Sequence, residues 1–530
     1  MSVYSLVDKP SSPEKGKMKE IKEMKIKPRV LIALMVIAMP LAGVADVRPA
    51  GLFADGMIVQ RETQAPVWGW ADAGEKVTVT GSWGQSASTT ADEAGKWGVK
   101  LQTPAAGGPY TVTLKGKNTI ELKNVLSGDV WLCSGQSNMV WPVSKLESSA
   151  EDIKNANYPL IRSFMVDSKM SLEELDDCGG AWAVCSPQTV QDFSAVAYFT
   201  GRELHTNLDV PIGLLTSCHG GTCVETWTPW SEQADDPYVQ KKMPETDPAT
   251  KGKNDPRLHR NYPSNLYNGM IHPLQPFAVK GAIWYQGEAN ANSGMTSAKH
   301  YRVQLARLAT GWRKAWGQEF PFYAVQLPNF KTPQVDPVEG YNAWAMIRES
   351  FVHAANNTPD LFTCTMIDIG GAGIHPKNKL DVGLRMASTI LNKTYGKETP
   401  TTPFMKSFKI EGDKVVITFE YTGSGLVAKG GKLKTFAIAG ADKKFVWADA
   451  EIVNRDGVEC VVVSSAEVKE PASVRYAWAT NPAECNLYSK EGFPASPFRT
   501  DEWIPVKPEK KAPGEKKEKP RRRKNRRKSK

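Results

Sequence analysis

A chain of 530 residues is longer than one hydrophobic core usually serves, so two or three domains are expected. The formal net charge of +10 is uneven: residues 507–530 carry +11, residues 1–29 carry +4, and residues 46–506 carry −5. A mildly acidic body does not favour nucleic-acid binding, so no nucleic-acid partner is expected. The Lys/Arg/Pro-rich residues 507–530 are predicted to form a disordered basic tail.

Residues 30–45 form a long apolar run that follows a Lys-rich stretch and ends in Gly-Val-Ala. A membrane span needs about 20 apolar residues, and this shorter run also contains a proline. A cleaved secretory signal with an extended basic start is therefore predicted over residues 1–45. We expect the mature protein to be exported, to a periplasm or the cell exterior, and to have no membrane span.

The eight cysteines suit an oxidising compartment. Cys178 and Cys185 are close enough in sequence to form a local bridge, and so are Cys218 and Cys223. Small buried thiols are the equal alternative, and the pairing stays open.

Three kinds of pattern divide the rest of the chain. Residues 46–126 consist of short alternating strands separated by turn residues, which predicts an N-terminal β-sandwich. Residues 127–400 alternate strands with helices, which predicts an α/β fold with a parallel sheet covered on both faces. Residues 401–506 return to strands and predict a C-terminal β-module. In the middle part we expect strands at 130–133, 212–216, 279–285, 322–326 and 361–367, and helices at 193–207, 301–316 and 343–355.

Ligands of open parallel sheets bind at the carboxyl ends of strands, and Ser137 lies just past such an end. It follows the expected strand 130–133 through a glycine-containing turn, at a point where a helix can begin. Free backbone N–H groups at a helix start favour a developing negative charge. Ser137 is therefore a candidate nucleophile, whereas Ser86 repeats the local Gly-Gln-Ser pattern in a β context.

Two further strand ends carry groups that can stabilise an anion. Gly220 and Gly221 follow the strand expected at 212–216, and paired glycines allow backbone N–H groups to approach a ligand. Gln286, Glu288 and Asn290 follow the strand expected at 279–285 and offer two neutral amides and a carboxylate.

His375 is the candidate base, because a glycine-rich loop at the strand end 361–367 carries it toward the same edge of the sheet. The six other histidines are interpreted as structural. A nucleophile, a base and preformed donors are what acyl transfer needs. The chain has no HExxH motif and no glycine-rich phosphate loop, so neither a metal nor another cofactor is expected.

Four sequence motifs that contain these residues resemble those of a known family: GDVWLCSGQSNM, VPIGLLTSCHGGTCVETWTP, KGAIWYQGEANA and IHPKNKLDVGLRMA. With them, residues 47–505 resemble the sialate O-acetylesterase branch of the SGNH hydrolases. The resemblance implies a flavodoxin-like three-layer core, Ser137 as nucleophile and His375 as base. It also implies an oxyanion hole made by the Ser137 N–H, by Gly221 in preference to Gly220, and by Gln286, with Asn290 as the fallback donor.

The chain departs from this family at two places. Ala372 stands three residues before His375, where SGNH enzymes generally have an aspartate. Either Asp368 or Glu288 orients His375, or a backbone carbonyl does so and the site is a Ser–His dyad. Cys218-His219 replaces the usual Ser-Trp and alters the wall of the pocket.

The sequence therefore predicts a secreted carbohydrate O-acetylesterase whose partner is an acetylated carbohydrate. The family name indicates sialic acid as the acetylated sugar, and acetylxylan or another polysaccharide is the alternative. A non-catalytic carbohydrate-binding protein with a degenerate esterase core is a third hypothesis, which Ala372 favours. The oligomeric state is not indicated.

Overall fold

The structure is a computed structural model that describes residues 46–243 and 255–503. The predicted signal segment 1–45 and the predicted basic tail 507–530 lie outside the described residues. Within the two described ranges, no helix is both long enough and apolar enough to cross a membrane.

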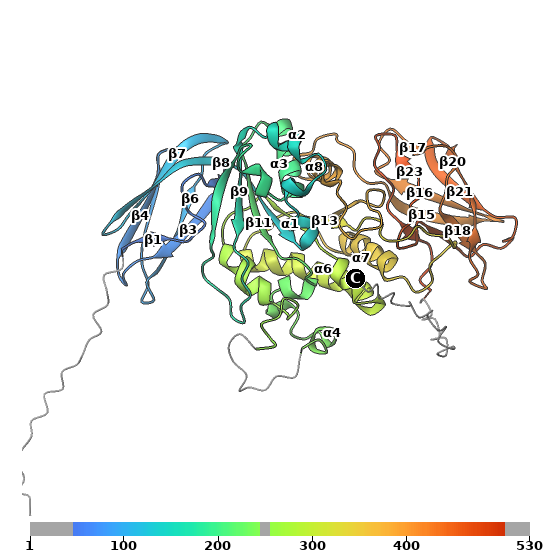
Figure 1. The fold of residues 1–530 in the computed structure, drawn as a ribbon, viewed down its shortest axis with the longest axis horizontal. Coiled ribbons are helices and arrows are strands. Elements are labelled where there is room, and N and C mark those ends of the chain that lie inside the picture. The colour runs from blue at the N-terminus through green and yellow to red at the C-terminus, as the bar shows by residue number, and fades with distance from the viewer. Residues whose placement is uncertain (1–45, 244–254, 504–530) are drawn as a thin grey trace, which may run out of the picture. The chain divides into compact units, whose positions relative to one another are not determined.

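The protein has a mixed α/β fold, as the sequence predicts, built on a central mixed sheet with the order β10-β9-β11-β8-β12-β13-β14 (Figure 1). From β9 to β14 neighbouring strands are parallel, and β10 is antiparallel to β9. The five strands expected between residues 127 and 400 are all present. The strands are β8 (Thr119–Gly135), β9 (Tyr158–Val166), β10 (Gly180–Cys185), β11 (Ile212–Cys218), β12 (Gly281–Tyr285), β13 (Phe322–Gln326) and β14 (Leu361–Thr365).

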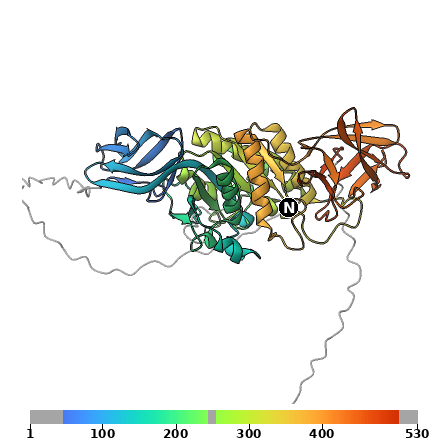
Figure 2. The same ribbon diagram turned by 90° about the horizontal axis from the view of Figure 1, so that it is seen from above.

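Helices pack on both faces of this sheet, which explains why its inner strands are nearly all apolar (Figure 2). Three of the four long helices match expected ones, and α8 was not expected from the sequence. The helices are α1 (Ser137–Val140), α2 (Ser149–Lys154), α3 (Ala195–Leu208), α4 (Pro237–Gln240), α5 (Glu288–Asn292), α6 (Met295–Trp316), α7 (Ala343–Asn357) and α8 (Lys379–Tyr395).

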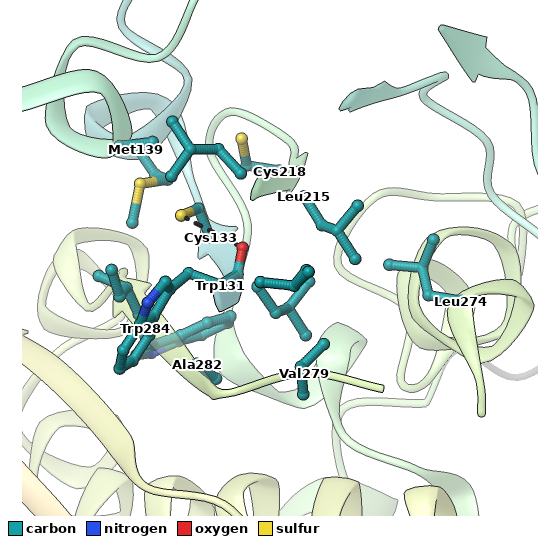
Figure 3. Packing of buried hydrophobic residues seen from close by; sticks show 14 of the residues in the cluster. Trp131, Cys133, Met139, Leu215, Cys218, Leu274, Val279, Ala282 and Trp284 are labelled. Atoms are coloured by element: carbon teal, nitrogen blue, oxygen red, sulfur yellow. Dashed lines mark hydrogen bonds between the residues drawn. The ribbon is translucent and has the colours of Figure 1, made fainter. Parts of the chain in front are cut away.

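Two tryptophans show the opposite faces of the sheet. Trp131 in β8 makes an edge contact with Tyr323, whose hydroxyl lies 2.6 Å from Thr394 of α8. Trp284 in β12 faces the other way and donates a 3.0 Å hydrogen bond to the Tyr301 hydroxyl of α6. Figure 3 shows both indoles within the buried cluster near Cys133 and Met139. The core therefore extends through the sheet and reaches the carboxyl end of β8.

β8 is a 17-residue strand that belongs to the N-terminal strands and to the central sheet at once. Its first half pairs with β2 and β7, and its second half pairs with β11 and β12. A domain boundary between residues 126 and 127 consequently falls inside a strand. The N-terminal strands are β1 (Arg48–Pro49), β2 (Ile58–Gln60), β3 (Gln64–Trp70), β4 (Lys76–Gly81), β5 (Gln85–Thr90), β6 (Lys96–Gln102) and β7 (Gly107–Lys115).

The C-terminal strands enclose a second hydrophobic cluster that includes Val415, Phe436, Val461 and Tyr476. The four-stranded sheets β15-β16-β21-β20 and β19-β18-β22-β24 contribute to it, as does the pair β17-β23. These strands are β15 (Phe404–Glu411), β16 (Lys414–Glu420), β17 (Leu426–Ala428), β18 (Phe436–Ala439), β19 (Val446–Trp447), β20 (Asp449–Arg455), β21 (Val458–Ser464), β22 (Ser473–Tyr476), β23 (Leu487–Ser489) and β24 (Phe498–Arg499).

All eight cysteines are free thiols, and all except Cys178 are buried. The local bridges that the sequence left open, Cys178–Cys185 and Cys218–Cys223, are not formed. Burial raises the pKa of these thiols, for example that of Cys223 to about 11, which disfavours the reactive thiolate at neutral pH.

Candidate active site

The turn after β8 lies at the point where the strand order reverses. In the parallel order β9-β11-β8-β12-β13-β14, β8 is the earliest strand in the chain and has later strands on both sides. Gly135 ends β8 with φ 139°, and a Cβ there would lie 2.1 Å from the Tyr285 carbonyl oxygen. Only glycine fits this approach. The chain then turns, and Ser137 becomes the first residue of α1.

Ser137 and His375 meet at this point, although 238 positions separate them in the sequence. Their Oγ and Nε2 atoms are 2.8 Å apart, which is hydrogen-bond distance. The ring of Trp141 packs against the imidazole, with 5.0 Å between the ring centroids. The hydroxyl can therefore donate its proton to a neutral His375.

Electrostatics favour that neutral imidazole. Partial burial lowers the pKa of His375 below its ordinary value of 6.5, and the positive charges of Lys379 and Lys145 lower it further. A histidine that is unprotonated at neutral pH can accept the proton of a serine.

The loop after β11 contains two glycines, of which Gly220 lies beside the nucleophile. A Cβ on Gly220 would lie 3.5 Å from the Ser137 Cβ, whereas one on Gly221 would lie 3.2 Å from the guanidinium carbon of Arg260. Among the described residues, no acceptor takes the backbone N–H of Ser137, Gly220 or Gly221. These three amides are consequently able to donate to a ligand.

Gln286 and Asn290, the expected side-chain donors, are buried and already bonded within the protein. Gln286 Nε2 donates to the Thr222 carbonyl at 2.8 Å and to Asn290 Oδ1 at 2.8 Å. Asn290 Nδ2 donates to Glu225 at 3.1 Å, and its Oδ1 also accepts from the Val224 N–H at 3.0 Å. Both side-chain amides are thus bonded within the protein, and the oxyanion role expected for them stays a prediction.

Neither of the two expected acids contacts His375. Asp368 accepts hydrogen bonds from both terminal nitrogens of Arg385, at 2.6 and 2.8 Å, and from the Tyr488 hydroxyl at 2.9 Å. Burial would raise the pKa of Asp368, but these partners lower it below its ordinary value. Across residues 46–243 and 255–503, no side chain bonds to His375 Nδ1, so the geometry is that of a Ser–His pair without a contacting acid.

Glu288 is buried, and its Oε1 accepts a hydrogen bond from Asn138, the residue after Ser137. Asn138 Oδ1 in turn accepts from Lys379 Nζ. Sequence reasoning missed Asn138 and Lys379. The available signal was their position, since Asn138 directly follows the nucleophile and Lys379 ends the IHPKNK string that carries His375.

In the part of the chain that the structure describes, no group of three or more His, Cys, Asp or Glu residues is arranged to bind a metal ion. His219, beside the paired glycines, has its Nδ1 2.7 Å from the Ser168 hydroxyl. Cys218 is buried in the central core.

Comparison with known proteins identifies relatives of the chain. A family described as carbohydrate esterase, sialic acid-specific acetylesterase matches residues 127–365. The sialate O-acetylesterase of Rattus norvegicus is 30% identical over 539 residues, which cover 89% of this chain and 98% of the relative. The Homo sapiens sialate O-acetylesterase is 29% identical over 497 residues, covering 85% and 92%. The crystal structure of a carbohydrate acetylesterase from Xanthomonas citri has a TM-score of 0.77 and 37% identity, covering 86% of this chain and 100% of that one.

Proposed function

Because the chain belongs to the sialate O-acetylesterase family of carboxylic ester hydrolases, we propose that it removes acetyl groups from carbohydrate hydroxyls. Ser137 is the nucleophile of this reaction and His375 is its base. The observation that carries the proposal is the 2.8 Å separation of Ser137 Oγ and His375 Nε2 at the switch point of the sheet.

The reaction begins when His375 Nε2 accepts the proton of Ser137 as Oγ attacks the acetyl carbonyl carbon. The tetrahedral intermediate collapses when the bond to the sugar oxygen breaks, and His375 returns the proton to that oxygen. Water, activated by the same imidazole, then hydrolyses the acetyl-enzyme and releases acetate. Without a contacting acid, the packing of Trp141 supports the orientation of the ring.

The oxyanion of the intermediate is bound by backbone amides. The donors are the N–H groups of Ser137 and Gly221, both of which are unbonded within the described chain. Gln286 acts indirectly, because its amide fixes the Thr222 carbonyl next to Gly221. Losing one donor of this kind costs about 3 kcal/mol of transition-state stabilisation.

Acetylated sialic acid is the proposed substrate, since the curated relatives carry that name. An acetylated polysaccharide such as acetylxylan is the second candidate, and the Xanthomonas citri relative, a carbohydrate acetylesterase, favours this broader class. Acetate release should be compared across acetylated sialic acid, acetylxylan and other acetylated glycans. Binding to these glycans without any acetate release would instead select a non-catalytic carbohydrate-binding protein.

We also propose the finer organisation that the sequence predicts. Residues 127–400 form a flavodoxin-like SGNH core, 46–126 an N-terminal β-sandwich that shares β8 with it, and 401–506 a C-terminal β-module. Residues 1–45 direct export and are removed. N-terminal sequencing of the protein recovered from outside the cytoplasm tests the export, and a mature chain that still begins before residue 30 would contradict it.

A further inference from the structure

Asn138 connects three segments of the proposed site through one buried amide. Its Nδ2 donates to Glu288 Oε1 and, at 3.1 Å, to the carbonyl oxygen of Ile374. Its Oδ1 accepts from Lys379 Nζ. An ammonium group only donates and a carbonyl only accepts, so these partners leave the amide one orientation. The turn that carries Ser137 is thereby bonded to the residue just before His375.

The charges around this amide are costly to bury. Asn138, Glu288 and Lys379 are 0%, 1% and 0% exposed. Lysine and glutamate are rarely buried so completely unless they are paired. Lys379 is moreover the first residue of α8, where the helix dipole disfavours a cation. Glu288 begins α5, where the dipole favours an anion. The opposite charges compensate each other across Asn138.

The His375 loop needs such an anchor. Gly371 and Gly373 contact nothing within 4 Å of a built Cβ, and Ala372 between them is exposed. Farther from His375, Asp368 holds the start of the loop through Arg385 and Tyr488. The Gly370 N–H donates to Asn329 Oδ1 at 2.6 Å, and the Gly371 carbonyl also accepts a hydrogen bond. The Asn138 bond lies nearest to His375.

We propose that Asn138, Glu288 and Lys379 are a positioning cluster that fixes the His375 loop. In other SGNH enzymes an orienting aspartate positions the histidine. The cluster acts on the peptide group that precedes His375 and does not contact the imidazole. This inference rests on the proposed roles of Ser137 and His375.

The first test compares Asn138→Ala with Asn342→Ala. Asn342 is also buried, and its side chain also has three partners, Glu339, Thr480 and the Ala345 N–H, none of which belongs to the pair or to the cluster. We expect Asn138→Ala to lower kcat for p-nitrophenyl acetate about 100-fold with little change in KM, because a displacement near 1 Å has that effect. Asn342→Ala should stay within about threefold of the wild type at a comparable loss of Tm. Equal kcat losses in the two variants would overturn the inference.

If Asn138→Ala does not fold, two variants of Glu288 provide a second test. Glu288→Gln retains an oxygen that can accept from Asn138, whereas Glu288→Ala retains none. If the cluster positions the loop, Glu288→Gln should keep at least about 10-fold more activity than Glu288→Ala. Similar activities would contradict the proposal.

The third test does not depend on ester hydrolysis. Lys379, Lys145 and partial burial all lower the pKa of His375, and burial lowers that of Lys379 to about 7 against the opposing effect of Glu288. The ring neighbours of Lys379, Tyr285 and Trp141, bring no opposing charge to this site. Lys379→Met should raise the pKa of His375 in an NMR titration, and an unchanged or lower pKa would argue against the cluster.

Labelling of Ser137 by a fluorophosphonate separates this inference from the proposed function. Labelling requires the serine and its base but no sugar. If the wild type is labelled and Asn138→Ala is labelled about 100-fold more slowly, the cluster is supported whatever the glycan. Equal labelling of the two proteins would overturn the cluster, whereas failure on every acetylated glycan would contradict only the proposed function.

Discussion

The turn that carries Ser137 and the loop that carries His375 differ in how the fold fixes them. Gly135, Gln136 and Asn138 are buried, and the Gln136 N–H donates to the Tyr285 carbonyl at 3.0 Å. Residues 368–375 include no buried residue, and individual hydrogen bonds at Asp368, Gly370, Gly371, Ile374 and His375 attach them to the rest of the protein. The buried end of β8 thus fixes the position of Ser137, whereas individual hydrogen bonds of the loop fix the position of His375. Substitutions in the turn should accordingly lower the unfolding free energy, whereas substitutions that loosen the loop should mainly lower kcat.

The largest expected effect removes the nucleophile itself. Ser137→Ala should lower kcat for p-nitrophenyl acetate by at least about 10⁴-fold, since the remaining groups cannot form an acyl-enzyme. Ser86→Ala is the matched control, because Ser86 occupies the same Gly-Gln-Ser pattern in β5. Retained activity in Ser137→Ala, measured as acetate release, would remove the nucleophile assignment.

Paired glycine substitutions test the contrast directly. Gly135→Ala should cost about 3 kcal/mol of unfolding free energy, because its φ is positive and a Cβ would overlap the Tyr285 carbonyl. Gly373→Ala meets no atom within 4 Å and should leave the unfolding free energy nearly unchanged. Urea unfolding of both variants measures the difference, and comparable losses would show that the loop is as constrained as the turn.

A smaller effect is expected at the second anchor of the loop. Asn329→Ala removes the acceptor of the Gly370 N–H and should lower kcat about 10-fold, since Gly370 is farther from His375 than Ile374 is. The Tm should fall modestly, because the buried partner Asn481 also loses a hydrogen bond. A kcat loss larger than that of Asn138→Ala would reverse the order of the two anchors.

The smallest effect concerns pH. The base works only when neutral, so kcat/KM should fall as pH decreases through the pKa of His375. Because burial, Lys379 and Lys145 lower that pKa, the midpoint of the acid limb should lie below 6.5. Lys145→Met removes an exposed positive charge and should move the midpoint slightly toward higher pH. A midpoint above 6.5 in the wild type would contradict this electrostatic account.

Buried strands were the most predictable part of the fold. Apolar runs bounded by turn residues located β11, β12, β13 and β14 within a few residues, because a strand covered on both faces must be apolar along its length. Elements with fewer apolar residues were not predicted from the sequence. The hairpin β9–β10 lies at the edge of the sheet with partly exposed residues. Only residues 130–133 of β8 were expected as a strand, because its first half is partly exposed and lacks a continuous apolar run.

The positions of Ser137 and His375 at strand ends followed from the local sequence, since a parallel sheet gathers its carboxyl ends at one edge. Their catalytic roles stay predictions for the variants above. What the local sequence could not reveal was which polar side chains partner each other. Asp368 is a candidate acid by position, yet it pairs with Arg385 and Tyr488, which are brought to it by α8 and by the C-terminal strands.

The sequence alone thus determined the family, the α/β class and the strand-end locations of Ser137 and His375. Periodic burial and motif residues are local properties, and local properties can be read along a chain. Only the tertiary structure decided that Gln286 bonds to Thr222 and that Asn138 joins Glu288 to Lys379. It likewise decided that no acidic side chain of residues 46–243 and 255–503 bonds to His375. Hydrogen bonds act over about 3 Å, so their partners depend on distances that form only when remote segments pack together.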